Sequence, residues 1–157
     1  NVIRFLGNYG SSRKYVFDYK GRNSRMDELQ AAVLSIKLKY LDEENARRQE
    51  IALYYLTHIR NAEITLPPHD STGNVWHVFP VLTQHPDELQ GHLNSMGIQT
   101  NIHYPIPPHK QQAYKEWNDR SYPIAEKIHH HEVSIPLNQT LTNDEVKTIV
   151  NALNTYH

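Results

Sequence analysis

The sequence lacks cysteine entirely and contains no long hydrophobic run. Without cysteine there is no disulfide framework, no thiolate nucleophile and no cysteine-ligated metal. No apolar run approaches the roughly 20 residues of a membrane span, and no signal-peptide pattern is found at the start. These absences favour a cytoplasmic location and predict no membrane partner.

Hydrophobic residues and net charge are also scarce. Only 38% of the residues are hydrophobic, whereas apolar residues approach half in well-packed domains when glycine is included, and six glycines do not close the gap. This predicts that part of the chain packs against something outside it. The 16 basic and 17 acidic residues nearly cancel, so no nucleic-acid partner is predicted. The length of 157 residues and the start at Asn1 rather than Met suggest a piece of a longer protein.

Helical periodicity marks the first part of the chain. From Met26, apolar residues recur at helical spacing, and neither Gly nor Pro interrupts before Pro67. One helix, or two nearly collinear ones, is therefore predicted over about 25–60. Ser24 fits the N-cap of this helix, with Asp27 as the acidic partner of a capping box.

The rest of the chain mixes short strands with helices. Helices are predicted from Pro86 to just before Gly97, over about 122–132, and from a capping box of Thr142 and Glu145 to about residue 156. Clusters of β-branched and aromatic residues predict four short strands: 62–68, 74–83, 98–104 and 133–137. The predicted fold class is α+β, a long helix plus a small, mostly antiparallel sheet covered by helices.

Two glycine-containing stretches have the composition of anion-binding loops. "GSSRKY" (10–15) and "GRNSR" (21–25) combine glycine with Arg, Lys, Asn and Ser donors. The N-terminus of the helix predicted to start near Arg25 would add a partial positive charge. Neither stretch is a Walker loop or a dinucleotide fingerprint, so a capped helix with a basic lead-in remains an alternative.

Histidine is abundant, with eleven copies. Consecutive helical residues point about 100° apart, so "HHH" at 129–131 cannot face one metal, and a solvated or partly buried cluster without metal is predicted. "NIHYPIPPHK" places His103 and Tyr104 at a predicted strand end before a proline-stiffened loop. Such a loop often presents side chains to a ligand, although a polar turn with a packed tyrosine fits equally well.

A family resemblance runs through nearly the whole chain. It is carried by "NYGSSRKY", "GRNSRMDELQAAVLSIKLKYLDEENARRQEIALYY", "VWHVFPV", "NIHYPIPPHKQQAY" and "YPIAEKIHHHEVSIPL". These stretches resemble the DegT/DnrJ/EryC1/StrS aminotransferases, pyridoxal-phosphate (PLP) enzymes that make amino sugars on nucleotide carriers. "HYPIPPH" after "GRNSRMDELQAA" looks most like the nucleotide 3-keto-6-deoxyhexose aminotransferases of this family.

The resemblance implies a fold-type-I architecture. Residues 1–23 would be the end of the large PLP-binding domain, 24–60 the connecting helix and 61–157 the small C-terminal α+β domain. The family's Schiff-base lysine would lie before residue 1, so no catalytic residue is expected in this chain, which alone should be inactive and should not retain PLP. The full-length protein would be a homodimer that transfers an amino group from glutamate to a keto-sugar nucleotide in amino-sugar or polysaccharide biosynthesis.

The resemblance also implies roles for five residues. Asn23 matches an asparagine that hydrogen-bonds the PLP phosphate of the neighbouring subunit, so the active sites would be shared. Lys14 and Tyr15 match a segment near the nucleotide-sugar, and His103 and Tyr104 match a loop near the hexose. The alternative is a non-catalytic dimerisation or regulatory module derived from this family.

Overall fold

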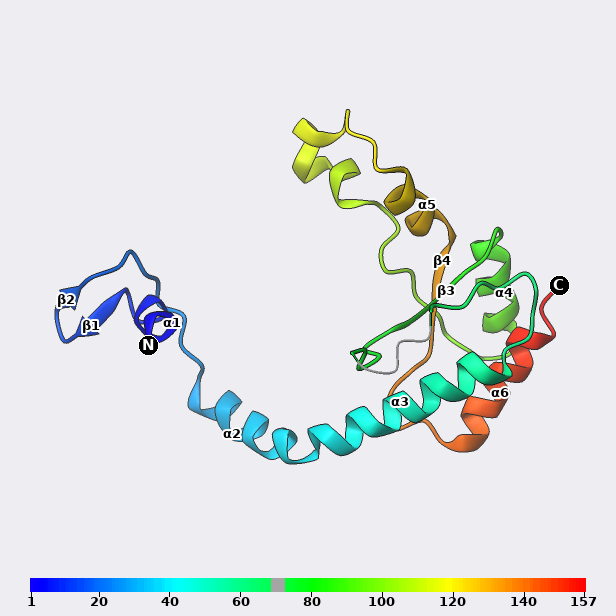
Figure 1. Cartoon of the computed structure of the whole chain (residues 1–157), viewed down its shortest axis with the longest axis horizontal. Coiled ribbons are helices and arrows are strands. Elements are labelled where there is room, and N and C mark those ends of the chain that lie inside the picture. Colours follow the sequence, from blue (N-terminus) through cyan, green and yellow to red (C-terminus); the bar gives the residue numbers. More distant parts are fainter. Residues whose placement is uncertain (69–72) are drawn as a thin grey trace. The chain divides into compact units, whose positions relative to one another are not determined.

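The computed structural model describes residues 1–68 and 73–157, and its contacts divide the chain into two compact units, Asn1–Asp42 and Glu43–His157. Helices and short antiparallel strands are mixed along the chain (Figure 1), which confirms the predicted α+β class. The assignment of 1–23, 24–60 and 61–157 to domains of a larger protein stays a prediction. No helix in the described part of the chain combines the length and apolarity needed to cross a membrane.

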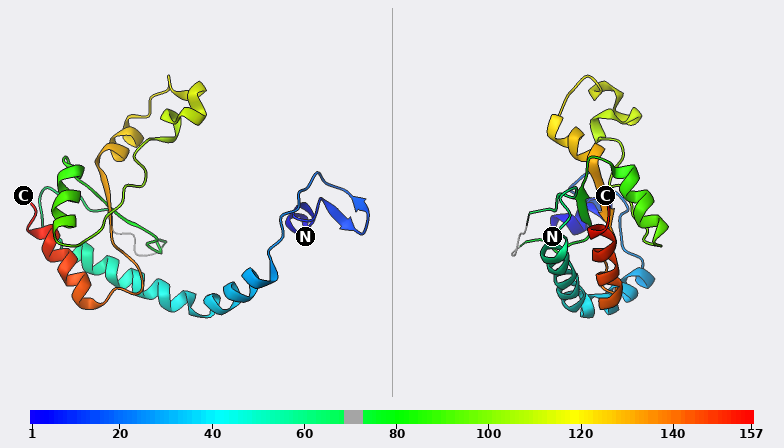
Figure 2. Two further views of the ribbon diagram at one scale, coloured as in Figure 1. Left: turned by 180° about the vertical axis from the view of Figure 1, so that it is seen from behind. Right: turned by 90° about the vertical axis from the view of Figure 1, so that its right-hand side faces the viewer.

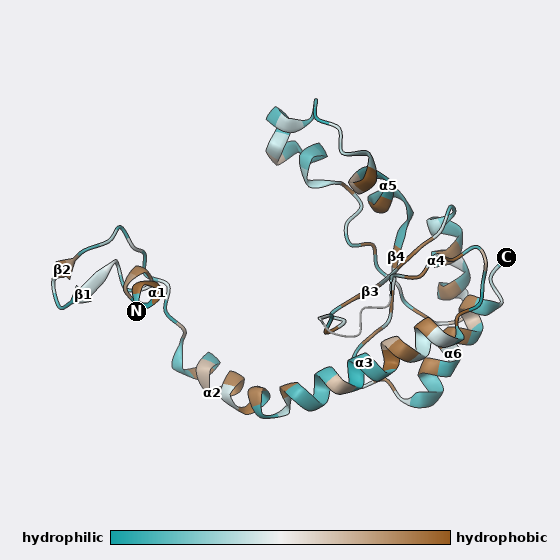
Figure 3. Ribbon diagram, viewed as in Figure 1, coloured by the Kyte–Doolittle hydropathy of each residue, from teal (hydrophilic) through white to brown (hydrophobic). Residues whose placement is uncertain are grey.

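The unit Asn1–Asp42 consists of small elements held by backbone hydrogen bonds. In chain order it contains α1 (Val2–Leu6), an antiparallel hairpin of β1 (Ser11–Arg13) and β2 (Val16–Phe17), α2 (Glu28–Lys37) and the 3₁₀ helix η1 (Leu38–Tyr40). All of its residues are described, and none of its hydrophobic side chains is buried. Figure 3 shows hydrophobic residues on α1 and α2, so apolar surface of this unit faces solvent.

The predicted capping box at the start of the long helix is wrong. Helix α2 begins at Glu28 with Asp27 as its N-cap, and no side chain caps it. Ser24 instead donates its backbone N–H to the Gly7 carbonyl at 2.8 Å, which keeps it in a paired loop. The helical stretch continues through η1 into α3 (Leu41–His58), so the prediction of a helix or two over about 25–60 holds from Glu28 to His58.

A small antiparallel sheet forms the centre of the unit Glu43–His157. Strand β3 (Phe79–Leu82) pairs with β4 (Glu132–Ile135) along its whole length. Single antiparallel bridges extend the sheet on both sides, Thr65 to Leu82 and Asn101 to Ser134. The predictions of strands over 62–68 and 98–104 are therefore wrong, because each segment forms only a single bridge. The strand predicted over 74–83 is shorter in the structure, and the strand predicted over 133–137 begins and ends earlier.

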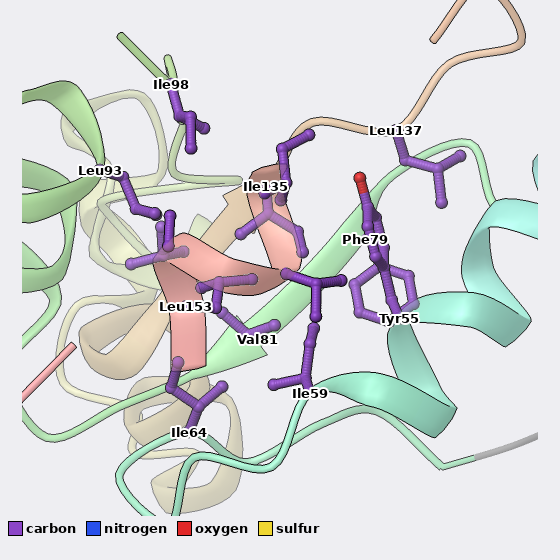
Figure 4. Close-up of a cluster of buried hydrophobic side chains, with 14 of the residues drawn as sticks. Tyr55, Ile59, Ile64, Phe79, Val81, Leu93, Ile98, Ile135, Leu137 and Leu153 are labelled. Atoms are coloured by element: carbon purple, nitrogen blue, oxygen red, sulfur yellow. The ribbon is translucent and has the colours of Figure 1, made fainter. Parts of the chain in front are cut away.

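Alternation along β3 and β4 gives the sheet two different faces. Phe79 lies opposite Ile135, and Val81 opposite Val133, and all four side chains are buried in the core. Helices α3, α4 (Pro86–Ser95) and α6 (Asn143–Asn154) and several connecting residues, among them Ile64 and Ile98, supply the rest of the core. Figure 4 shows these side chains meeting, among them Tyr55, Ile59, Leu93 and Leu153.

Helices α3 and α6 run side by side and are tied at both ends. Near the start of α6, Arg47 donates to the Leu141 carbonyl and to Asn143 Oδ1 at 2.8 and 2.7 Å. At the other end, Asn154 accepts from the Arg60 N–H at 2.7 Å and donates to the His58 carbonyl at 2.9 Å. Both views of Figure 2 agree with this arrangement. The two helices are therefore joined by hydrogen bonds near both ends of α6.

The helices of this unit begin and end as their local signals predict. Pro86 opens α4, and Gly97 just beyond its end has a φ of +76°, which favours glycine. Helix α5 (Pro123–His131) confirms the predicted helix at 122–132, and both hydrogen bonds of the capping box of Thr142 and Glu145 are formed at the start of α6. The loop before α5 contains only two 3₁₀ helices, η2 (Pro108–Lys110) and η3 (Gln112–Trp117).

Candidate functional site

Asn23 lies in an extended loop that is paired with residues 6–9. The Arg22 N–H donates to the Leu6 carbonyl and the Tyr9 N–H donates to the Arg22 carbonyl, both at 2.9 Å. Asn23 itself forms an isolated antiparallel bridge with Asn8. The backbone on both sides of Asn23 is therefore fixed, although the side chain is exposed.

Two glycines allow this loop to pack so closely. A Cβ on Gly21 would lie 2.2 Å from the Gly10 nitrogen, and a Cβ on Gly10 would lie 1.7 Å from the Tyr19 carbonyl oxygen. Gly10 also has a φ of +81°, a conformation that L side chains rarely adopt. No side chain fits at either position, so glycine in "GRNSR" serves to place Asn23.

Arg25 fixes the orientation of the Asn23 amide. Its Nε donates to Asn23 Oδ1 at 2.9 Å, so the Nδ2 group of Asn23 is the free end of the amide. Among the hydrogen bonds of residues 1–68 and 73–157, none is donated by this Nδ2. Two amide N–H groups beside a guanidinium make a suitable donor set for an anion. The predicted contribution of a helix N-terminus near Arg25 is wrong, because α2 begins only at Glu28.

Lys14 and Tyr15 form the tip of the hairpin between β1 and β2. Tyr15 has a φ of +64° and its side chain is 81% exposed. The Lys14 Nζ lies 5.1 Å from the centroid of the Tyr15 ring, within cation–π range. The tip thus presents a positive charge and an aromatic ring to solvent.

His103 and Tyr104 lie in the other unit, beside the polar face of the sheet. Nδ1 of His103 lies 2.9 Å from the Ser134 hydroxyl, and its Nε2 lies 3.1 Å from Asn101 Nδ2. The Tyr104 side chain is 66% exposed, while its carbonyl accepts a hydrogen bond from Nδ1 of His129. The histidine is held by its neighbours, and the largely exposed tyrosine ring packs edge-on against it, with the ring centroids 5.4 Å apart.

A hollow of about 430 Å³, with both polar and apolar walls, lies beside the sheet. Its lining includes His77, Asn101, His103 and Ser134. Behind Ser134, the buried carboxylate of Glu132 accepts hydrogen bonds from the Ser134 hydroxyl and, at 2.7 Å, from the backbone N–H of His103. The hollow therefore has hydrogen-bonding walls that are themselves fixed from behind.

Sequence reasoning missed Glu132 and Ser134. The alternation in "EVSI" from Glu132 to Ile135 contains the signal, because Val133 and Ile135 face the core and the two polar residues share the other face. The predicted strand began at residue 133, so the glutamate was assigned to the preceding helix. Starting the strand one residue earlier would have placed both polar side chains beside each other.

The histidine cluster at the end of α5 serves local contacts. His129 contacts the Tyr104 carbonyl, and His131 Nδ1 donates to the Lys127 carbonyl at 2.6 Å. Within the described ranges, no group of three or more His, Cys, Asp or Glu side chains is arranged to hold a metal ion.

The five predicted site residues belong to both compact units. Asn23, Lys14 and Tyr15 lie in Asn1–Asp42, whereas His103 and Tyr104 lie in Glu43–His157. The structure brings His103 together with the polar face of the sheet and brings Arg25 together with Asn23. The ligand roles of all five stay predictions.

The chain is similar to known sugar transaminases along almost its whole length. It is 53% identical over 99% of its residues to the dTDP-3-amino-3,6-dideoxy-alpha-D-galactopyranose transaminase of Aneurinibacillus thermoaerophilus. It is 41% identical over 96% of its residues to the dTDP-3-amino-3,4,6-trideoxy-alpha-D-glucose transaminase of Streptomyces venezuelae. The chain spans 42% and 41% of the lengths of these two relatives.

A solved structure shares the fold. The crystal structure of S. venezuelae DesV in complex with a ketimine intermediate matches 97% of this chain with a TM-score of 0.88 and 39% sequence identity, over 42% of its own length. Fold and sequence thus both match sugar aminotransferases, over about 42% of the length of those proteins. The chain belongs to the DegT/DnrJ/EryC1/StrS aminotransferase family, whose model matches residues 1–154.

Proposed function

We propose that this chain is the C-terminal part of a PLP-dependent aminotransferase acting on nucleotide sugars. In the complete protein it would help transfer an amino group from glutamate to a dTDP-linked keto sugar of the 3-keto-6-deoxyhexose class. The observation that carries the proposal is the 53% identity over 99% of the chain to a dTDP-3-amino-3,6-dideoxy-sugar transaminase.

The loop around Asn23 fits the phosphate of PLP. The Asn23 Nδ2 would donate to a phosphate oxygen, and the Arg25 guanidinium, which holds Oδ1 at 2.9 Å, would add positive charge beside it. The close packing at Gly10 and Gly21 lets the backbone hold this donor in place without a side chain in the way. When bound, PLP supplies the electron sink that transamination requires.

The remaining predicted residues would contact the sugar nucleotide. Lys14 at the hairpin tip offers a positive charge suited to a diphosphate, and Tyr15 beside it offers an aromatic face. His103 lines the hollow and Tyr104 is the next residue along the chain. The hydrogen-bonding groups of the hollow suit the hydroxyls of a hexose. The chain would thus bind and orient the substrate, while the Schiff-base lysine acts from a segment before residue 1.

The proposal predicts that these 157 residues alone do not catalyse transamination. Mixing them with PLP should give only the absorbance of free PLP, with no amino transfer from glutamate to a keto-sugar nucleotide. An absorbance band of a protein-bound Schiff base, together with turnover by the isolated chain, would contradict this assignment.

A complementation experiment tests whether Asn23 acts on the partner subunit's site. One subunit of the complete protein carries Asn23→Asp, which places a carboxylate against the phosphate, and the other subunit lacks the Schiff-base lysine. If Asn23 acts in trans, one site of the mixed dimer combines the intact lysine with the intact Asn23. Each parent homodimer should then be inactive, and the mixed dimer should recover activity at one of its two sites.

Ser24→Ala is a matched control for this experiment. Ser24 is exposed and joins the loop through its backbone N–H, so removing its hydroxyl leaves the pairing with Gly7 in place. This variant should bind PLP as the wild type does, measured by the absorbance of the dialysed enzyme. A mixed dimer that stays inactive would show that Asn23 serves its own subunit, and an active Asn23→Asp homodimer would show that Asn23 has no role in holding the cofactor.

A further inference from the structure

Glu132 is a buried carboxylate whose neighbours are donors rather than cations. Its residue is 2% exposed, and no ion pair to it is formed within residues 1–68 and 73–157. Burying a carboxylate is costly unless hydrogen bonds satisfy its oxygens. Here the backbone N–H of His103 donates to Oε2 at 2.7 Å and the Ser134 hydroxyl donates to Oε1. The two residues that supply these donors, His103 and Ser134, both line the hollow.

The Asn101 amide sets the direction of the hydrogen bonds around His103. Its Oδ1 accepts from the backbone N–H of Ile102 at 2.9 Å, so the other end of the amide, Nδ2, is the group 3.1 Å from His103 Nε2. An amide nitrogen only donates, so Nε2 must accept and carries no proton.

The position of the imidazole proton follows from this. A neutral His103 without a proton on Nε2 carries it on Nδ1, which then donates to the Ser134 hydroxyl oxygen at 2.9 Å. That hydroxyl is free to donate its own hydrogen to Glu132 Oε1, as the structure shows. The four side chains thus form one consistent series of donors and acceptors, running from Asn101 through His103 and Ser134 to Glu132.

The two ring nitrogens of His103 differ in how firmly they are occupied. Nδ1 is bonded to Ser134, which is buried, whereas Nε2 is bonded to Asn101, and all three residues line the hollow. Asn101 is exposed, so a ligand can share or replace its bond to Nε2. A hydroxyl group, which donates, suits this nitrogen, whereas an anionic phosphate, which only accepts, does not.

We propose that Glu132 and Ser134 are positioning residues that hold His103 as the neutral Nδ1–H tautomer, so that Nε2 accepts a hydrogen bond from a hydroxyl of the sugar. The choice of a sugar as the ligand rests on the proposed function, whereas the tautomer does not. The hydrogen-bond series therefore selects the hexose part of a nucleotide sugar, and the diphosphate binds elsewhere.

Nitrogen NMR of the ligand-free chain tests the tautomer directly. Long-range ¹H–¹⁵N correlation spectra distinguish Nδ1–H from Nε2–H imidazoles, and the wild type should show Nδ1–H for His103. Ser134→Thr keeps the hydroxyl and should keep this tautomer, whereas Ser134→Ala should lose it. Asn101→Ala removes only the donor to Nε2 and should leave Nδ1–H in place.

Ser95→Ala is the matched control. It removes a hydroxyl of the same unit that donates to a carbonyl, that of His92, at 2.7 Å, and it should leave the His103 signals unchanged. If Ser134→Ala does not fold, Ser134→Thr and Asn101→Ala still decide the matter. A wild-type Nε2–H tautomer, or one that follows Asn101 instead of Ser134, would overturn the assignment.

Binding to the complete protein tests the choice of ligand. The probes are dTDP-6-deoxyglucose, which has sugar hydroxyls and no keto group, and dTDP, which has none of this hexose. Ser134→Ala should weaken the binding of dTDP-6-deoxyglucose by about 2- to 10-fold, which is the effect of one lost hydrogen bond. The affinity for dTDP should not change. Ser134→Thr should bind dTDP-6-deoxyglucose as the wild type does. Equal weakening of both probes would overturn hydroxyl selection. A wild type that binds neither probe would refute the proposed function, while the NMR result would still stand or fall independently.

Discussion

The two compact units differ in what holds them together. Residues 43–157 bury a hydrophobic cluster between β3, β4 and the helices α3, α4 and α6. In residues 1–42, all of which are described, Gly10 is the one buried residue, and close backbone hydrogen bonds at glycines hold the loop and hairpin. The unit of residues 43–157 therefore has a core of its own, whereas the unit of residues 1–42 has apolar surface that is available to a partner.

The contrast is sharp even within one helical stretch. Helix α2 buries no residue and exposes Leu29 by 79%, whereas α3 buries Ile51, Ala52 and Tyr55. Both helices carry apolar residues at helical spacing, so periodicity alone does not tell which face meets a partner within the chain. This agrees with the low hydrophobic share of the sequence, and with the proposal that the complete protein supplies the missing surface.

Removing a leucine from each unit should give the largest difference. Leu153→Ala empties a fully buried position in α6, so the free energy of unfolding should fall by about 2–5 kcal/mol. Leu29→Ala in α2 removes an exposed side chain and should leave the free energy of unfolding of this chain within about 0.5 kcal/mol of the wild type. Urea unfolding followed by circular dichroism measures both. A comparable loss for Leu29→Ala would mean that the first unit also buries its helix.

The two capping-box sequences should differ next. Thr142→Ala removes a hydroxyl that accepts from the Glu145 N–H at the start of α6, and should cost about 1 kcal/mol. Ser24 occupies the equivalent place in "SRMD" but caps no helix. Ser24→Ala should therefore change the free energy of unfolding by no more than about 0.5 kcal/mol. Equal losses in urea unfolding would restore the helix start predicted at Ser24.

The same cap should make the second unit sensitive to acid. Hydrogen bonds from the Thr142 backbone and hydroxyl lower the pKa of Glu145 below its ordinary value. The stabilisation is present above the ordinary glutamate pKa of about 4.3 and is lost as pH falls through the lower folded value. The free energies of unfolding of the wild type and Thr142→Ala should therefore move closer together from pH 6 to 2, because the wild type alone has the hydroxyl's hydrogen bond to the Glu145 carboxylate. Part of the difference should stay at pH 2, because the hydrogen bond from the Glu145 N–H to the hydroxyl does not depend on this ionisation. A constant difference would show that the bond from the hydroxyl to the carboxylate contributes nothing.

Tyr55→Phe should remove a single hydrogen bond from the core of residues 43–157, an effect similar in size to that of Thr142→Ala. The buried hydroxyl donates to the Pro136 carbonyl at 2.8 Å, and its loss should cost about 1 kcal/mol at neutral pH. Burial raises the pKa of Tyr55, so the wild type loses stability as pH rises above about 10, where the unfolded tyrosine ionises first. Thermal unfolding at pH 7 and 11 should show a smaller fall for Tyr55→Phe. An equal fall in both proteins would exclude ionisation of Tyr55 as the cause.

Local signals predicted the helices of the second unit well and the strands less well. The cap of α6, and Pro86 and Gly97 around α4, act within a few residues, so the sequence contains the whole signal. The strands predicted over 62–68 and 98–104 became single bridges, because a ladder needs a partner strand that periodicity does not specify.

For the candidate site residues too, the sequence supplied some parts and the structure supplied others. Asn23 was found from the resemblance, whereas its hydrogen bond from Arg25 and the glycine contacts that place it came from the structure. At the second site, His103 and Tyr104 were named from a loop signal and the resemblance, but Glu132 was not, since it belongs to a strand about thirty residues away.

The sequence by itself determined the family, the helices of residues 43–157 with the capping box of α6, and the residue types of both candidate sites. These depend on short stretches in which neighbouring residues carry the information. Only the tertiary structure decided which apolar residues are buried, and that Asn101, His103, Ser134 and Glu132 form one hydrogen-bond series. The physical reason is that burial and hydrogen-bond direction depend on which strand and loop become neighbours, and the pairing of β4 with Asn101 fixes that.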